Sequence, residues 1–352
     1  SFEESHSAFI KKFQKDQQAL LAQGMKEEDM KVIDIINQAA QNSAPRFTIE
    51  LLPPLKGDGT QGVFSAIDTL VEYGPAYINV TFQREDEKLG EREDGLWERR
   101  VTRRRPGTVG ISAAIMKRYG IETVPHLICG GLSRYDIEDA LIDMDFLGIE
   151  NVLALRGDSR RTERRFAPHP DGHAYADGLV RQIAAMNRGE FVDGEVENCH
   201  HSKFCIGVAG YPEKHSEAPN MATDIENLRR KIDAGAEYIV TQMCFDNQRI
   251  FEFIERCRAA GITVPIVPGL KPFTTKSQLT VLPQTFHVDL PEELVKAVSQ
   301  CKDNRAVKQV GIEWATMQAR ELKAAGLPVI HLDSIYAAMP GGEARSANLQ
   351  LF

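Results

Sequence analysis

Asn151-Val-Leu-Ala-Leu-Arg-Gly-Asp158 is the stretch of sequence that decides the fold. Four apolar or small residues run into Arg156, Gly157 and Asp158, so a buried strand would end in a cation, a flexible glycine and a carboxylate. In barrels of alternating strands and helices, the loops at the C-terminal ends of the strands form the open face that carries the chemistry. The plainer interpretation is a salt-bridged loop with an ordinary glycine turn, and only a repeat of the pattern elsewhere decides between the two.

The pattern does repeat along the chain. Strand-like apolar segments lie at residues 46–52, 76–82, 122–129, 151–155, 205–209, 238–245, 265–270 and 328–332. Helix-like segments lie between them at residues 62–73, 111–119, 135–147, 173–188, 221–234, 248–259 and 291–325. The strands are apolar almost throughout, as in a parallel sheet that helices cover. Eight such units predict an α/β fold of the closed (β/α)8 TIM-barrel type, and an open Rossmann sheet is disfavoured because no Gly-x-Gly-x-x-Gly follows a strand.

The segments outside this rhythm define the expected domain organisation. Residues 1–43 form an N-terminal helical extension with an amphipathic pattern, whose apolar stripe must cover either the barrel or a subunit interface. Residues 44–352 form the barrel domain, with insertions at 83–110 and 189–204. The first insertion is densely charged and ends near Arg103-Arg104-Arg105. This arginine run is either a solvated loop or a basic segment that attracts an anionic substrate tail.

Composition excludes several classes of protein. The net charge of −8 argues against general nucleic-acid binding, and no apolar run approaches the roughly 20 residues that span a bilayer. Six scattered cysteines and the lack of a signal pattern at the N-terminus predict free thiols and a cytoplasmic location. The cluster Cys199, His200, His201 and Cys205 has a spacing that zinc can use, but no second ligand pair matches it. We therefore expect no metal, and a homo-oligomer is left open.

Hydrogen-bonding or titratable side chains end most of the strands and would converge on one face. They include Glu50, Thr81, His126, Arg156, Asp158, Tyr211, His215 and Gln242. Two carboxylates can differ in proton affinity when one of them is more buried, as Glu50 and Asp158 could. Each side chain also has a structural interpretation: Glu50 as a buried ion-pair partner, His126 as a core histidine and Gln242 as a strand cap.

Taken together, these segments resemble the methylenetetrahydrofolate reductase family of flavin-dependent barrel enzymes. The resemblance covers roughly residues 46–334 and rests on an ordered set of motifs. They are Glu50-Leu-Leu-Pro-Pro, Val80-Thr81, Pro125-His126-Leu-Ile-Cys129, Ala154-Leu-Arg-Gly-Asp158, Gly210-Tyr-Pro-Glu-Lys-His215, Arg230-Lys231-Ile-Asp-Ala-Gly-Ala236 and Thr241-Gln242. An ordered set of this kind is far more specific than any one of its members.

The resemblance implies that FAD binds at the top of the barrel, with NADH or NADPH as co-substrate and a folate as substrate. Matched by position, the flavin-binding residues are Thr81, His126, Arg156, Asp158, Tyr175, Ala176, Tyr211, His215, Asp224 and Lys231. Glu50 is implied as the acid that assists protonation of the folate, and Asp158 as a carboxylate near the flavin and the folate. Gln242 is implied as a folate-binding amide, and Lys276 stands where the family often has an aromatic substrate contact.

The implied reaction is reduction of 5,10-methylenetetrahydrofolate to 5-methyltetrahydrofolate by a reduced nicotinamide through the flavin. Two alternatives stay open: a flavin-free folate-binding methyltransferase, and a catalytically inactive barrel that serves as a binding module. A flavin absorption band tests the first alternative and a turnover assay tests the second. The chain departs from the family pattern after Val80-Thr81, where the long insertion begins, and in His331-Leu-Asp-Ser334 of the last strand. It also ends soon after the eighth unit, so we expect no S-adenosylmethionine-binding regulatory domain.

Overall fold

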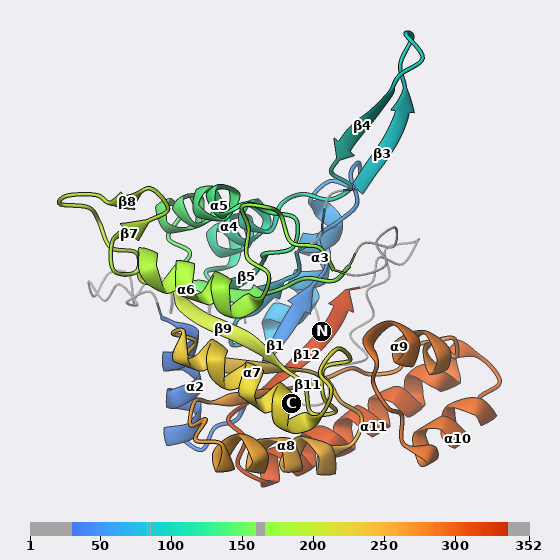
Figure 1. The fold of residues 1–352 in the computed structure, drawn as a ribbon. Helices are drawn as coiled ribbons and strands as arrows, with labels where there is room; N and C mark the ends of the chain where they lie inside the picture. Colours follow the sequence, from blue (N-terminus) through green and yellow to red (C-terminus); the bar gives the residue numbers. More distant parts are fainter. Residues whose placement is uncertain (1–29, 83, 85, 160–165, 337–352) are drawn as a thin grey trace, which may run out of the picture.

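A computed structural model describes residues 30–82, 84, 86–159 and 166–336 of the chain (Figure 1). Within them, eight strands close into a barrel in the order β1-β12-β11-β10-β9-β6-β5-β2, and neighbouring strands run parallel. The strands are β1 (Arg46–Leu51), β2 (Ile78–Val80), β5 (Thr123–Ile128), β6 (Asn151–Leu155), β9 (Cys205–Gly210), β10 (Tyr238–Met243), β11 (Ile266–Leu270) and β12 (Val329–Tyr336). The predicted TIM barrel is confirmed, since each of the eight predicted segments contributes one strand.

Helices surround the barrel and bury one apolar face each against it. They are α3 (Gln61–Leu70) with the short 3-10 turn η1 (Val71–Tyr73), α4 (Thr108–Tyr119), α5 (Arg134–Phe146), α6 (Ala176–Met186), α7 (Met221–Asp233) and α8 (Asn247–Ala259). The predicted single helical tract at residues 291–325 is wrong in detail, because it is split into α10 (Glu292–Gln300) and α11 (Asn304–Ala324). Cys301 takes an extended conformation, and the Asp303 side chain then accepts from the Ala306 N–H and starts a new helix. A further helix that the sequence pattern did not predict, α9 (Gln278–Phe286), contains Pro283.

Helix α2 (Val32–Gln41) closes the N-terminal end of the barrel. Its buried residues Val32, Ile35 and Ile36 belong to the same apolar cluster as Tyr77 and Tyr238, which fill the barrel floor. The Val32 N–H donates to the Asn151 side chain at 2.8 Å, which ties the start of the helix to the first residue of β6. The rest of the predicted extension, residues 1–29, lies outside the described residues, and the domain boundary at residue 43 stays a prediction.

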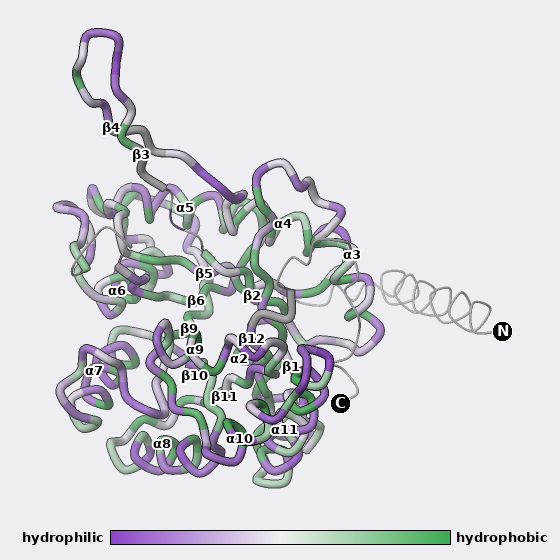
Figure 2. The backbone as a smooth tube through the Cα atoms, turned by 90° about the vertical axis from the view of Figure 1, so that its right-hand side faces the viewer, coloured by the Kyte–Doolittle hydropathy of each residue, from purple (hydrophilic) through white to green (hydrophobic). Residues whose placement is uncertain are grey.

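The two predicted insertions each contain a small antiparallel hairpin. In the first, β3 (Asp86–Glu91) pairs with β4 (Trp97–Thr102) and projects well away from the barrel (Figures 1 and 2). In the second, β7 (Glu190–Phe191) pairs with β8 (Gly194–Glu195). The base of the long hairpin is fastened to the C-terminal end of the barrel: Arg84 donates to the Asp158 carbonyl at 3.1 Å, and Arg105 donates to the Pro53 carbonyl.

No helix in the described ranges is both long enough and apolar enough to cross a lipid bilayer. The hydropathy of the chain agrees with the barrel architecture, since the barrel strands are largely hydrophobic while the surrounding helices alternate hydrophobic and hydrophilic residues (Figure 2).

Candidate active site

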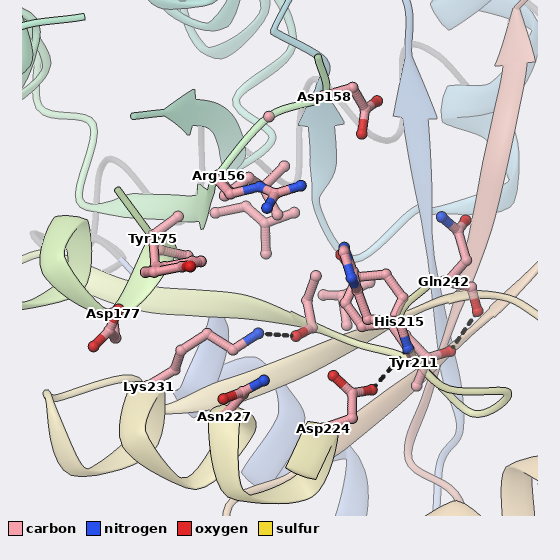
Figure 3. Close-up of a pocket in the computed structure, with 18 of the residues that line it drawn as sticks. Arg156, Asp158, Tyr175, Asp177, Tyr211, His215, Asp224, Asn227, Lys231 and Gln242 are labelled. Atoms are coloured by element: carbon pink, nitrogen blue, oxygen red, sulfur yellow. Dashed lines mark hydrogen bonds between the residues drawn. The ribbon is translucent and has the colours of Figure 1, made fainter. Parts of the chain in front are cut away.

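A cavity of about 500 Å³ opens at the C-terminal ends of the strands (Figure 3). Its walls come from β1, β5, β6, β9, β10 and β12, together with the first residues of α6 and one face of α7. A volume of this size is within the range of pockets that hold small molecules and cofactors. The predicted site residues in its lining are Glu50, His126, Arg156, Asp158, Tyr175, Ala176, Tyr211, His215, Asp224, Lys231 and Gln242. The barrel therefore brings together most of the set that the sequence predicted.

Lys231 provides a half-buried cation on one side of this cavity. It stands in the last turn of α7, and its Nζ donates to the Ala209 carbonyl of β9 at 2.6 Å. The same Nζ lies 6.0 Å from the centre of the Tyr211 ring. Burial disfavours the ammonium and lowers the pKa of Lys231 to about 8, although the carboxylate of Asp224 acts in the opposite direction. An anionic ligand group would restore the charge balance of this side chain.

His215 is held beside Lys231 by the loop that follows β9. Its backbone N–H donates to the Asp224 carboxylate at 2.9 Å, and its ring meets the Tyr211 ring edge-on with centroids 4.8 Å apart (Figure 3). Burial lowers the pKa of His215, and the nearby Arg156 lowers it further. Asp224 is itself buried on α7, and its contact with the His215 N–H holds the backbone of the loop in place. The prediction that it binds the flavin directly is not tested by this contact.

Arg156 is a second cation on the same side of the cavity, and it is paired with a residue that the sequence analysis did not predict. Its guanidinium forms two hydrogen bonds with Glu217, at 2.6 and 2.9 Å, and it lies over the Phe166 ring at 4.5 Å. The hydrogen bond with Arg156 is the main cause that lowers the pKa of Glu217. Glu217 is about half exposed, so an anionic ligand can exchange with it at the rim. No sequence signal marked Glu217, because the contact joins two loops 61 residues apart.

The opposite side of the cavity carries a cluster of acids and histidines. Glu50 Oε2 lies 3.7 Å from His331 Nε2 and 4.0 Å from His126 Nε2, and His331 Nε2 lies 3.2 Å from Asp333 Oδ1. We call Glu50, His126, His331 and Asp333 the acid cluster. All four side chains line the cavity, and each is at most 15 % exposed. His331 and Asp333 were noted in the sequence only as a departure from the family pattern, because their meaning depends on which strand lies beside β12.

The two histidines of the acid cluster differ in their affinity for protons. Burial lowers the pKa of His126 to about 4, and Glu50 only partly offsets this. Burial also acts to lower the pKa of His331, but the carboxylates of Asp333 and Glu50 beside its Nε2 outweigh this effect and raise the value to about 9. Burial raises the pKa of Asp333. Near neutral pH the cluster therefore contains one charged and one neutral imidazole.

Asp158 and Gln242 lie on the cavity wall as predicted. The Gln242 side-chain oxygen accepts from the Met243 N–H at 3.0 Å, which leaves its amide nitrogen pointing into the cavity side (Figure 3). The backbone carbonyl of Asp158 accepts from Arg84, so the charged insertion fixes the loop that carries this carboxylate. Tyr175 is 65 % exposed at the rim, and Ala176 begins α6 beside it.

Two predicted site residues do not line this cavity. Thr81 follows β2, and its buried hydroxyl has no hydrogen-bond partner among the described residues. Lys276 directs its ammonium away, donating to the carbonyls of Ser299 at 2.7 Å and Cys301 at 3.4 Å. For Lys276 to touch a substrate it would have to exchange these bonds, so its role stays a prediction.

In the described residues, Cys199, His200, His201 and Cys205 do not bring three potential ligand atoms within 4.8 Å of one another. His200 pairs with Asp145 at 3.6 Å, whereas the Cys199 thiol faces the Gly189 carbonyl at 3.7 Å. In the part of the chain that the structure describes, the one set of three potential ligands within 4.8 Å is Glu50, His331 and Asp333. The Nε2 atom of His331 lies 3.2 Å from the Asp333 carboxylate and 3.7 Å from the Glu50 carboxylate, so we treat these three residues as a cluster that can share a proton. All six cysteines are free thiols.

The cavity fits a cofactor that has an anionic pyrophosphate. Lys231, Arg156 and His215 place three nitrogen donors along one wall, and among the described residues no carboxylate lies within hydrogen-bond distance of the half-buried Lys231 ammonium. Such donors match phosphate oxygens, and Tyr211 adds a flat ring between them. If FAD is bound, these residues are the ones that would hold its pyrophosphate, and the group would supply the redox chemistry there.

Comparison with known proteins identifies the family. The sequence profile of methylenetetrahydrofolate reductase matches residues 35–339. The chain belongs to the methylenetetrahydrofolate reductase family. It is 30 % identical over 308 residues to 5,10-methylenetetrahydrofolate reductase of Pectobacterium carotovorum, covering 87 % of this chain and 91 % of that protein. The family resemblance inferred from the motifs is thus confirmed.

Relatives from plants are longer than this chain. Methylenetetrahydrofolate reductase (NADH) 1 of Arabidopsis thaliana is 33 % identical over 313 residues, covering 86 % of this chain and 48 % of the relative. The chain therefore spans about half the length of the plant reductases that it matches. A solved structure from Clostridium thermocellum, described as binding two copies of 5-methyl-5,6,7,8-tetrahydrofolic acid, has a TM-score of 0.53 at 13 % identity, covering 90 % of this chain and 97 % of that one. At that identity the likeness concerns the fold alone.

Proposed function

We propose that this protein reduces 5,10-methylenetetrahydrofolate to 5-methyltetrahydrofolate, with FAD as its cofactor and NADH or NADPH as the electron source. Membership of the methylenetetrahydrofolate reductase family supports the reaction. The observation that carries the proposal is the division of one cavity into a cationic wall and an acid cluster. A flavin nucleotide needs the first and protonation of a folate nitrogen needs the second.

The cationic wall would bind and orient the cofactor. Lys231, Arg156 and His215 offer their donors to the pyrophosphate, while Asp224 fixes the loop that carries His215. FAD, when bound, supplies hydride transfer between the nicotinamide and the folate. The protein contributes binding, orientation and electrostatics. Asp158 adds a negative charge to the same wall and would disfavour further negative charge near it.

The acid cluster would manage the proton of the folate half-reaction. Opening the methylene bridge requires a proton at the folate nitrogen that bears it, and Glu50 is the carboxyl that lines the cavity between two imidazoles. A positioned general acid typically contributes about 10²–10⁴-fold to the rate. Gln242 of β10 lines the same cavity and would hold the folate by its side-chain amide. We further propose a cytoplasmic location, which the six free thiols support.

The test begins with the purified protein. A flavin absorption band that is released by denaturation and identified as FAD supports the cofactor assignment, and a colourless active protein would instead favour a flavin-free methyltransferase. Anaerobic mixing with NADH or NADPH should bleach that band, and 5,10-methylenetetrahydrofolate should restore it with formation of 5-methyltetrahydrofolate. A flavin-loaded protein that shows neither half-reaction with any nicotinamide or folate would mean that the barrel is a binding module.

A further inference from the structure

The acid cluster contains a feature that the proposed reaction does not yet use. His331 and Asp333 are two residues apart on β12, so their side chains leave the strand on the same face. Thr48 of β1 is paired with His331, which places Glu50, two residues further on, beside the same face. One ring nitrogen, His331 Nε2, thereby faces both carboxylates: Asp333 at 3.2 Å and Glu50 at 3.7 Å.

The charges around this ring favour a cation at His331. Two carboxylates share a site that is almost closed to water, and like charges in such a site repel strongly unless a proton lies between them. His126, which faces Glu50 from β5, is neutral at pH 7 because burial lowers its pKa to about 4. Lys271, which directly follows β11, is a further cation whose charge partly offsets the rise in the pKa of Asp333. The proton between the two carboxylates therefore resides on His331.

The second ring nitrogen also has a neighbour. His331 Nδ1 lies 3.4 Å from the side-chain amide nitrogen of Asn79, while the amide oxygen of Asn79 is buried without a partner in the described structure. A half-turn of the amide exchanges its bond to the Thr48 hydroxyl for one accepted from Nδ1–H. Asn79 can thus accept from the ring when the ring is charged, and both N–H groups of the imidazolium are then satisfied.

We propose that His331 stores the proton that Glu50 delivers to the folate, and that Asp333 keeps His331 charged for this purpose. The proposal rests on the proposed function. In the step, the Nε2–H bond of His331 breaks and an O–H bond forms at Glu50 Oε2. The neutral carboxyl of Glu50 then gives that proton to the folate nitrogen. No electrons are exchanged, and one proton taken up from the solvent, passed on by water that enters the cavity, returns to Nε2, so the net change is one solvent proton consumed per folate. His331 and Asp333 act through Glu50 and are positioning residues.

The first experiment measures each half-reaction of the flavin-loaded protein by stopped-flow absorbance across a pH series. For the wild type, the rate of the folate half-reaction should fall as pH rises through about 9, where His331 loses its proton. Asp333→Asn removes the charge that holds this proton, so the same fall should begin at least about one pH unit lower. The pH profile of the nicotinamide half-reaction should not move, because no proton to the folate is involved there.

The matched control is Asp177→Asn. Asp177 also lines the cavity and loses one negative charge in this variant, but it lies at the rim of α6, where it pairs with Arg181 at 2.6 Å. It should leave the alkaline limb of the folate half-reaction in place. If both variants shift the limb equally, the effect is a general one of net charge and the assignment to His331 is overturned.

A second measurement separates this proposal from the proposed function. In ¹⁵N spectra of the flavin-loaded protein, the His331 ring, assigned by loss of its signals in His331→Gln, should carry protons on both nitrogens at pH 7. Its titration should move to lower pH in Asp333→Asn and in Glu50→Gln. A neutral His331 at pH 7 in the wild type overturns the proposal even when the enzyme is fully active. A charged His331 in a protein without folate turnover overturns the proposed function, and with it the relay.

Discussion

The two ends of the barrel are built from the same strands and have opposite characters. At the N-terminal end, Tyr238 of β10 packs with Ile36 of α2, and Asn151 of β6 receives the Val32 N–H. At the C-terminal end, Gln242 lies next to the last residue of β10 and Arg156 directly follows β6, and both line the cavity. The N-terminal end is closed by apolar contacts, whereas the C-terminal end contains charged side chains that are partly shielded from water.

This difference shows how one strand can serve stability and chemistry at once. Buried apolar side chains at the closed end stabilise the fold through the surface they remove from water. Charged groups at the open end are costly to bury and persist because they are paired or because a ligand completes them. Substitutions at the two ends should therefore affect different measurements, and four variants test the contrast, from the largest expected effect to the smallest.

Ile36→Ala at the closed end should reduce the free energy of unfolding by about 2–5 kcal/mol, because it leaves a cavity beneath the barrel floor. Urea denaturation measures this, and the rate constants of both half-reactions at 25 °C should stay unchanged. Gln38→Ala on the exposed face of α2 is the control and should change stability by less than about 0.5 kcal/mol. A large loss of activity in folded Ile36→Ala would break the contrast between the two ends.

Glu50→Gln at the open end should slow the folate half-reaction on the order of 10²-fold, which corresponds to about 2.7 kcal/mol in the barrier. Reduction of the flavin by the nicotinamide should stay rapid, because no proton is delivered to a folate in that step. Stopped-flow absorbance resolves the two. Equal losses in both half-reactions would show that Glu50 holds the cavity together structurally, as a buried ion-pair partner would.

The double variant with His215→Ala and Lys231→Ala should weaken FAD binding by about tenfold or more, the scale of about 1.4 kcal/mol or more for charge-assisted hydrogen bonds. The wild type should also lose FAD affinity as pH rises through about 8, where Lys231 gives up its proton in the ligand-free protein. Below that pH the ammonium is present and binding is full. Fluorescence titration of the apoprotein measures both effects. Lys214→Ala, which changes the residue before His215, is the control that shows how far a disturbed loop alone weakens FAD binding. Full FAD loading of the double variant would contradict the phosphate assignment.

Asp158→Asn should have the smallest effect, raising the flavin reduction potential on the order of 30 mV, because one negative charge near the reduced ring is removed. Slower folate reduction should accompany the shift. Spectroelectrochemical titration measures the potential directly. An unchanged potential in a folded, FAD-loaded variant would place Asp158 away from the flavin and leave it as a folate contact alone.

Much of the site could be predicted because its residues directly follow buried strands. The apolar runs that lead to Glu50, Arg156 and Gln242 predicted both the barrel and the face on which these side chains meet. The partners of those residues could not be predicted. Glu217 and Arg156 lie on two different loops and form an ion pair. The Nε2 atom of His331 contacts both Asp333 and Glu50, and this shared contact gives Asp333 its role. Closure of the barrel, which joins the first strand to the last, makes that contact.

By itself the sequence determined the repeating strand–helix units, the closed barrel they build and the end of it that carries the chemistry. These depend on local patterns: apolar runs that must be buried and polar residues at strand ends. The tertiary structure decided which charges pair, which imidazole holds a proton and which helix covers the floor. Those outcomes depend on distances of 3–4 Å between segments far apart in the chain and on the low dielectric that burial creates, and neither is written in the order of residues.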